Sequence, residues 1–93
     1  MNNLTTIKPP PRIVRKPEVL EILGISKSTL FNRIQAGLLP PSINLGGRAC
    51  GWLEEEIQSV LMALVANRKP DAIKELVKDL VKARQTKGGL ING

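Results

Sequence analysis

The feature that most constrains the fold is the stretch of residues 24–37, which reads GISKSTLFNRIQAG. Ser26 predicts a helix start, because its hydroxyl can accept a hydrogen bond from a backbone N–H that the first helical turn leaves unpaired. Gly37 predicts the helix end, since glycine adopts the left-handed conformation without steric cost. The apolar residues share one face at helical spacing: Ile25, Leu30 and Ile34. We therefore expect a tight turn followed by a short helix near residues 27–36.

The opposite face of this helix carries hydrogen-bond donors and positive charge but no acidic side chain: Lys27, Ser28, Thr29, Asn32 and Arg33. A helix that hides its aliphatic side chains and exposes such residues is suited to a nucleic-acid groove. The same chemistry also fits an ordinary polar surface helix, and the helix alone does not separate these two interpretations. Phe31 falls between the two faces, so the sequence assigns it to neither.

A preceding helix is predicted at residues 17–23. Pro17 suits a first helical turn, and Glu18 complements the positive end of the helix dipole. Two short helices joined by a tight glycine-containing turn predict a helix-turn-helix unit. A generic helical hairpin is the alternative, which the cap and the basic second helix make less favourable. Upstream, the pair Ile13-Val14 fits either a brief strand or an extended lead-in.

A β-hairpin is predicted to follow the prolines at positions 40 and 41. Residues 42–45 alternate polar and apolar, residues 50–53 form the return strand, and the turn between them carries Arg48 near its tip. A hairpin of two strands must lean on the helices to be stable. Trp52 is the expected anchor, with its ring buried and its indole N–H directed at a backbone carbonyl. No nucleotide-binding fingerprint surrounds the glycine-rich turn, so we expect no nucleotide site there.

Two further helices are predicted. The third begins at the acidic run of residues 54–56, which suits a helix N-terminus, and ends near Asn67. The fourth spans residues 71–84 and carries an apolar stripe at helical spacing: Ile73, Leu76, Val77, Leu80 and Val81. This stripe either packs back on the same domain or forms a homodimer contact through residues 70–84.

Composition limits the chemistry that is open to the chain. Its 93 residues suit one small domain and include no histidine and a single cysteine, Cys50. Because the acidic run has no partner nucleophile, histidine or metal-ligand spacing, we expect no catalytic residues, no metal, no cofactor and no enzymatic activity. No apolar run is long enough to span a bilayer, and the lone cysteine suits a reducing compartment. We therefore expect a soluble, cytoplasmic protein.

The charge is unevenly distributed along the chain, whose net charge is +6. Residues 1–52 carry seven basic and two acidic side chains, a net +5, whereas residues 53–93 carry seven and six, a net +1. The positive field therefore belongs to the half that holds the predicted helix-turn-helix unit. Such a field favours a polyanionic partner or a membrane surface.

The order of these parts resembles the AlpA family of phage and genomic-island regulators and, more broadly, the excisionase-like and MerR-like winged helix-turn-helix domains. Several segments carry the resemblance in order and spacing: Glu18-Val19, residues 23–31, Ala36-Gly37, residues 39–41, residues 44–48 and Gly51-Trp52. The similarity covers roughly residues 12–67. Two features depart from the family pattern, namely the sequence Leu38-Leu39-Pro40 and the length of the last helix.

The resemblance implies a fold that is mainly α with a small β-hairpin wing, a winged helix-turn-helix, to which the residue pattern adds a C-terminal amphipathic helix. Together they divide the chain into four parts: a flexible N-terminal arm at residues 1–11, a DNA-binding domain at residues 12–67, the C-terminal helix at residues 68–85 and a flexible tail at residues 86–93.

The resemblance also implies sequence-specific binding to double-stranded DNA of a mobile element, and hence a cytoplasmic protein associated with the nucleoid. The protein would act as a transcriptional regulator, as an excisionase-type recombination directionality factor with an integrase as partner, or as both. The helix at residues 27–36 would enter the major groove and Arg48 the minor groove or its phosphates. Asn32 and Arg33 would read base edges. Lys27, Ser28 and Thr29 would contact phosphates or bases, and Arg15 and Lys16 would reach flanking phosphates. The alternative function is a protein-interaction adaptor or anti-repressor that uses the C-terminal helix.

Overall fold

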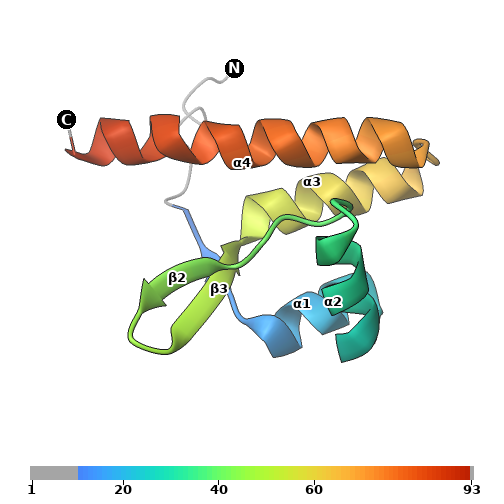
Figure 1. The fold of residues 1–93 in the computed structure, drawn as a ribbon, viewed down its shortest axis with the longest axis horizontal. Coiled ribbons are helices and arrows are strands. Elements are labelled where there is room, and N and C mark those ends of the chain that lie inside the picture. Colours follow the sequence, from blue (N-terminus) through green and yellow to red (C-terminus); the bar gives the residue numbers. More distant parts are fainter. Residues whose placement is uncertain (1–10, 93) are drawn as a thin grey trace, which may run out of the picture.

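The computed structural model describes residues 11–92, with side chains described through Gln85. The elements in chain order are β1 (Ile13–Val14), α1 (Lys16–Leu23), α2 (Lys27–Gln35), β2 (Ile43–Gly46), β3 (Ala49–Leu53), α3 (Glu54–Val65) and α4 (Pro70–Asn92). The predicted class, mainly α with a small β-hairpin wing, is confirmed. In Figure 1, α4 lies along one side of α3, while α1, α2 and the β2–β3 hairpin lie on the other side. Residues 1–10 of the predicted N-terminal arm lie outside the described residues.

The sheet has three antiparallel strands in the order β1-β3-β2. The pair Ile13-Val14 is a strand, because these residues pair with Leu53 and Trp52 of β3. The backbone N–H of Glu54 then donates to the carbonyl of Arg12 at 2.8 Å. The wing is therefore anchored by a third strand as well as by the helices.

Close approach of β1 to β3 depends on Gly51, which is buried in the middle of β3. A Cβ atom added at Gly51 would lie 2.7 Å from Cγ2 of Ile13 and 2.9 Å from the carbonyl oxygen of Val14. One of these neighbours is backbone and cannot rotate away. Only glycine fits here without moving the strand.

The ends of α1 and α2 are fixed by local hydrogen bonds. The backbone N–H of Arg15 donates to Oε1 of Glu18 at 3.1 Å, and Gly24 ends α1 in the left-handed conformation with φ of 64°. Ser26 caps α2, since its Oγ accepts from the backbone N–H of Thr29 at 3.2 Å. The predicted N-cap is therefore confirmed, and the predicted bounds of both helices agree with the observed ones to within one residue.

The core is aliphatic apart from one indole ring and draws on every helix. Its buried members are Val14, Val19, Leu30, Leu39, Trp52, Ile57, Val60, Ile73 and Val77. The last two come from α4 and are only 4% and 6% exposed. The other residues of the predicted stripe, Leu76, Leu80 and Val81, pack against the same core. Of the two options that the sequence left open, the structure shows packing within the same domain.

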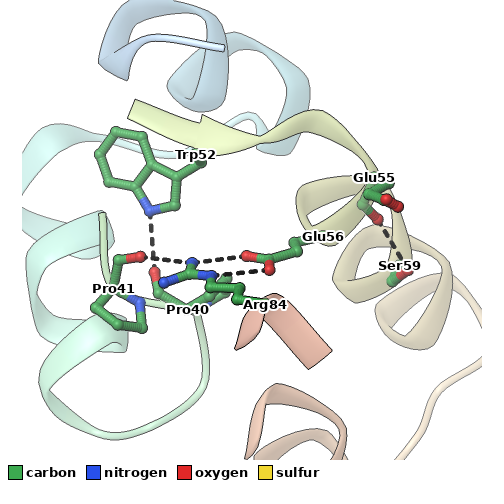
Figure 2. Close-up of polar contacts among 7 residues, drawn as sticks. All are labelled: Pro40, Pro41, Trp52, Glu55, Glu56, Ser59 and Arg84. Atoms are coloured by element: carbon green, nitrogen blue, oxygen red, sulfur yellow. Dashed lines mark hydrogen bonds and ion pairs between the residues drawn. The ribbon is translucent and has the colours of Figure 1, made fainter. Parts of the chain in front are cut away.

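A polar network joins the start of the wing to α3 and α4 (Figure 2). The indole N–H of Trp52 donates to the carbonyl of Pro40 at 2.9 Å, as the sequence predicted. Arg84 of α4 donates to both carboxylate oxygens of Glu56 and also to the carbonyl of Pro41 at 2.8 Å. The carbonyls of Pro40 and Pro41, which are consecutive in the chain, thus accept hydrogen bonds from β3 and from α4 respectively. The sequence missed the second half of this network.

Helix α4 extends beyond the end that the sequence predicted. It runs to Asn92, so the backbone of residues 86–92, assigned from sequence to a flexible tail, is helical. The glycines in this segment suggested a stop, but a glycine within a helix costs only about 1 kcal/mol relative to alanine. With no proline after Pro70, each added residue still gains a helical hydrogen bond.

Candidate nucleic-acid interface

Packing of α2 on the core defines which of its side chains face solvent. Leu30 is 3% exposed and Ile34 is half-buried against the core. Helical periodicity then directs the other side of α2 outward. One continuous set of exposed residues results, which we call the α2 strip: Lys27, Ser28, Phe31, Asn32 and Gln35. It contains a cation, two amides and a hydroxyl but no carboxylate, so it offers hydrogen bonds to an anionic partner.

Two of the residues that the sequence placed on this face lie at its edge. Thr29 is half-buried, and its Oγ1 accepts a hydrogen bond from Oγ of Ser26 at 3.0 Å. Its hydroxyl is therefore engaged in capping α2. Ser28 Oγ lies 3.4 Å from the same Ser26 hydroxyl but the residue is exposed.

Arg33 is the second edge residue. It is half-buried and lines a hollow of about 160 Å³ together with Leu38, which follows α2, and with residues of α3, the α3–α4 turn and the start of α4: Leu64, Arg68, Pro70 and Ile73. The side chain of Arg33 thus borders the α3–α4 turn. Asn32, which is exposed, lies nearer the centre of the strip.

Two residues of the α2 strip were not among the predicted contacts: Phe31, which the sequence assigned to neither helix face, and Gln35. Gln35 follows Phe31 by four residues and Asn32 by three, so the three side chains are neighbours on the helix surface. The sequence did contain a signal for Gln35, because helical spacing places it outside the apolar face that Leu30 and Ile34 share. Phe31 is 62% exposed.

The wing carries its predicted cation at its far end. Arg48 is exposed in the two-residue turn between β2 and β3. The turn is preceded by a bulge between Asn44 and Gly46, where the backbone N–H of Gly46 donates to Oδ1 of Asn44 at 2.8 Å. Both the β2–β3 hairpin and α2 project from α3 on the side away from α4 (Figure 1).

Arg15 and Lys16 are also exposed and stand at the N-terminus of α1. They directly follow β1, in which Val14 pairs with Trp52. This pairing places the two cations beside the sheet that forms the base of the wing. The structure therefore holds Arg15 and Lys16 on the sheet-side end of the helix-turn-helix unit.

The basic side chains divide into paired and unpaired groups. Arg12 forms ion pairs with Glu54 at 3.0 Å and with Glu18 at 3.5 Å, and Arg84 pairs with Glu56. Within residues 11–85, no ion pair involves the five predicted DNA-contacting cations: Arg15, Lys16, Lys27, Arg33 and Arg48. Their charge is not neutralised locally, and it remains available to an anionic ligand.

The described part of the chain shows neither a metal site nor a membrane-spanning helix. Among residues 11–85, no cluster of three or more histidine, cysteine, aspartate or glutamate side chains is arranged to hold a metal ion. None of the described helices is both long and apolar enough to cross a bilayer.

Comparison with known proteins adds two matches. The family model described as prophage CP4-57 regulatory protein (AlpA) matches residues 12–61. A protein of enterobacteria phage P4, described as uncharacterized protein ORF88, is 38% identical over 58 residues. This match covers 62% of the present chain and 66% of the phage protein, slightly less than two thirds of its length. No solved structure matches the chain significantly.

Proposed function

The chain belongs to the AlpA family of prophage regulatory proteins, and on that premise we propose that it binds double-stranded DNA sequence-specifically as a regulator of a mobile element. The observation that supports this best is the α2 strip, an exposed helix face with donors, a cation and no carboxylate. An α-helix fits the major groove of B-DNA, where such side chains can reach base edges. Leu30 holds this face outward by packing into the core.

We assign the following roles on this surface. Asn32 reads a base edge, since its amide can pair with adenine in bidentate fashion. Lys27 and Ser28, in the first turn of α2, contact phosphate or bases, and Thr29 supports them through the cap. Arg33 reaches a guanine or a phosphate from the edge of the strip.

The wing and the start of α1 extend this contact. Arg48 at the wing tip enters the minor groove or binds its phosphates. Arg15 and Lys16 contact flanking phosphates. These contacts would fix the orientation of α2 on the duplex without reading sequence themselves.

The regulator would act at a promoter, as an excisionase-type directionality factor that works with an integrase, or in both ways. The two activities use the same DNA-binding surface, so they require separate assays. A promoter-reporter assay and an excision assay with the element's own integrase distinguish them. Loss of both activities on substitution of Asn32 would link both to the α2 strip.

The alternative function, an adaptor or anti-repressor that presents the apolar stripe of α4, is less well supported. Ile73 and Val77 are 4% and 6% exposed and belong to the core of this chain. A partner or a second copy that used them would have to displace α4 from its own domain. A homodimer through residues 70–84 meets the same obstacle.

The experiment that tests the proposal begins with selection of binding sites from a randomised duplex library by the full chain. Fluorescence anisotropy then measures the affinity of the selected duplex for the wild type, Asn32→Ala and the matched control Gln85→Ala. Gln85 is an exposed amide on α4, and this helix lies on the opposite side of α3 from α2 (Figure 1). We expect Asn32→Ala to lose about 5- to 150-fold in affinity, the value of a good bidentate base contact, and the control to lose none. Failure to enrich any sequence, or equal affinities of the three proteins, would refute sequence-specific binding through α2.

A further inference from the structure

Phe31 is an aromatic side chain without a place in the core. The 93-residue chain has two aromatic residues, and the other, Trp52, is 2% exposed and anchors the wing. Phe31 is 62% exposed on α2. A single exposed apolar residue is common on protein surfaces and needs no special explanation. The surroundings of Phe31 are what make it informative.

The neighbours of Phe31 on the helix surface are exposed residues of the α2 strip, apart from Ile34, which follows by three residues and is half-buried against the core. Lys27 precedes it by four residues, Ser28 precedes it by three and Gln35 follows it by four, which are the spacings at which helical side chains adjoin. The phenyl ring therefore lies within the surface that carries the unpaired cation Lys27. A helix face of this kind suits an anionic partner that also presents an apolar group.

Duplex DNA presents one apolar group in its major groove, the C5 methyl of thymine. The other groups on the base edges there are hydrogen-bond donors or acceptors, which a phenyl ring cannot pair. We propose that Phe31 is a specificity-determining residue that contacts a thymine methyl group in the major groove. This inference rests on the proposed DNA-binding function and adds a base preference to it.

The contact predicts a preference for thymine over cytosine at one position of the site. Cytosine lacks the methyl and carries an amino group where thymine has O4; the ring pairs with neither group, so the methyl is the difference that it senses. Burial of one methyl-sized group corresponds to about a fourfold change in affinity. The expected effect of the methyl alone is therefore small but measurable.

The test replaces each thymine of the selected duplex in turn with deoxyuridine, which keeps the pairing edge and removes only the methyl. Anisotropy titrations of the full chain compare the wild type with Phe31→Ala, Phe31→Leu and Asn32→Ala. We expect the wild type to lose about fourfold at one thymine, and Phe31→Ala to bind more weakly and no longer to distinguish the two bases there. Phe31→Leu, which retains an apolar side chain, should keep part of the discrimination. Asn32→Ala should weaken binding and keep the full methyl effect.

The outcomes separate this inference from the proposed function. If the wild type binds the selected duplex but Phe31→Ala shows the same thymine preference, the inference is wrong and DNA binding stands. The inference is also wrong, and DNA binding again stands, if Phe31→Ala binds every duplex with wild-type affinity. The exposed ring would then be available to contact a protein partner. If the wild type binds no duplex, both fall. Because Phe31 is exposed, its variants should unfold at the wild-type urea concentration, which checks that they are folded.

Discussion

Arg84 donates two hydrogen bonds to the fully buried carboxylate of Glu56, from Nε at 2.9 Å and from Nη2 at 2.7 Å. Glu56 lies within the residues that match the AlpA family, whereas Arg84 lies on α4, outside them. The matched segment of this chain thus buries a charge whose partner comes from the added helix (Figure 2). Helix α4 is part of the same folding unit as the wing.

Replacement of Arg84 by methionine should destabilise the protein strongly. A buried carboxylate without its counter-charge typically costs about 3–5 kcal/mol, a large share of the stability of a small domain. The double variant Glu56→Leu/Arg84→Met should be more stable than Arg84→Met alone, because it removes the stranded charge. Urea unfolding followed by circular dichroism measures both. The control is Lys78→Met, which removes an exposed ion pair with Glu75 and should change the stability by less than about 1 kcal/mol. An Arg84→Met variant as stable as this control would contradict the account.

Replacement of Trp52 by phenylalanine should loosen the start of the wing. The buried carbonyl of Pro40 loses its hydrogen-bond donor, which costs about 1–3 kcal/mol, and the smaller ring leaves a void. Urea unfolding followed by circular dichroism gives the change in free energy. A variant with wild-type stability would mean that the Trp52–Pro40 contact does not hold the wing.

Substitution of Gly51 by alanine should destabilise the sheet by about 1–3 kcal/mol, as overpacking of a close contact does. The new methyl group would meet Ile13 and the carbonyl of Val14 at distances too short for a Cβ atom. Gln58→Ala, at an exposed position in α3, is the control and should be close to neutral. Equal midpoints for the two variants in urea would show that β1 does not pack as described.

Removal of the unpaired cations should change the salt dependence of DNA binding. Each phosphate contact contributes about one unit to the slope of log affinity against log salt concentration. Lys27→Ala and Arg48→Ala should each lower that slope by about one unit if both residues bind phosphate. Lys82→Ala, an exposed lysine on α4, should leave it unchanged. The slopes come from anisotropy titrations between about 50 and 200 mM salt, the range over which phosphate contacts are resolved. A slope that falls only in Lys82→Ala would place the DNA on the opposite side of the molecule.

Local chemistry made much of the fold predictable. Ser26 and Gly24 act on neighbouring backbone groups, so residue type and position were sufficient to place the helix-turn-helix unit. Trp52 was recognisable because a single indole in an aliphatic chain is the natural anchor for a small hairpin. The sequence did not decide whether β1 is a strand, because a segment of two residues becomes a strand through its pairing partner and not through its own pattern.

The contacts that the sequence missed are either long-range or depend on how α2 is rotated about its own axis. An acidic residue near a helix start is already explained by the helix dipole, so Glu56 gave no sign of a distant partner. That partner, Arg84, lies 28 residues away. Thr29, Phe31 and Arg33 fall near the boundaries of the helix faces. Only the packing of Leu30 on the core decides which of them is exposed.

The most direct test of the central claim is a ¹H–¹⁵N titration of the full chain with the selected duplex. If α2 and the wing bind DNA, the amide signals that shift should belong to residues 27–35 and to the turn at Gly47 and Arg48. The signals of the α4 face that carries Lys74, Lys78 and Lys82 should stay in place. Shifts confined to α4, with α2 and the wing unchanged, would contradict the assignment of α2 as the DNA-reading helix.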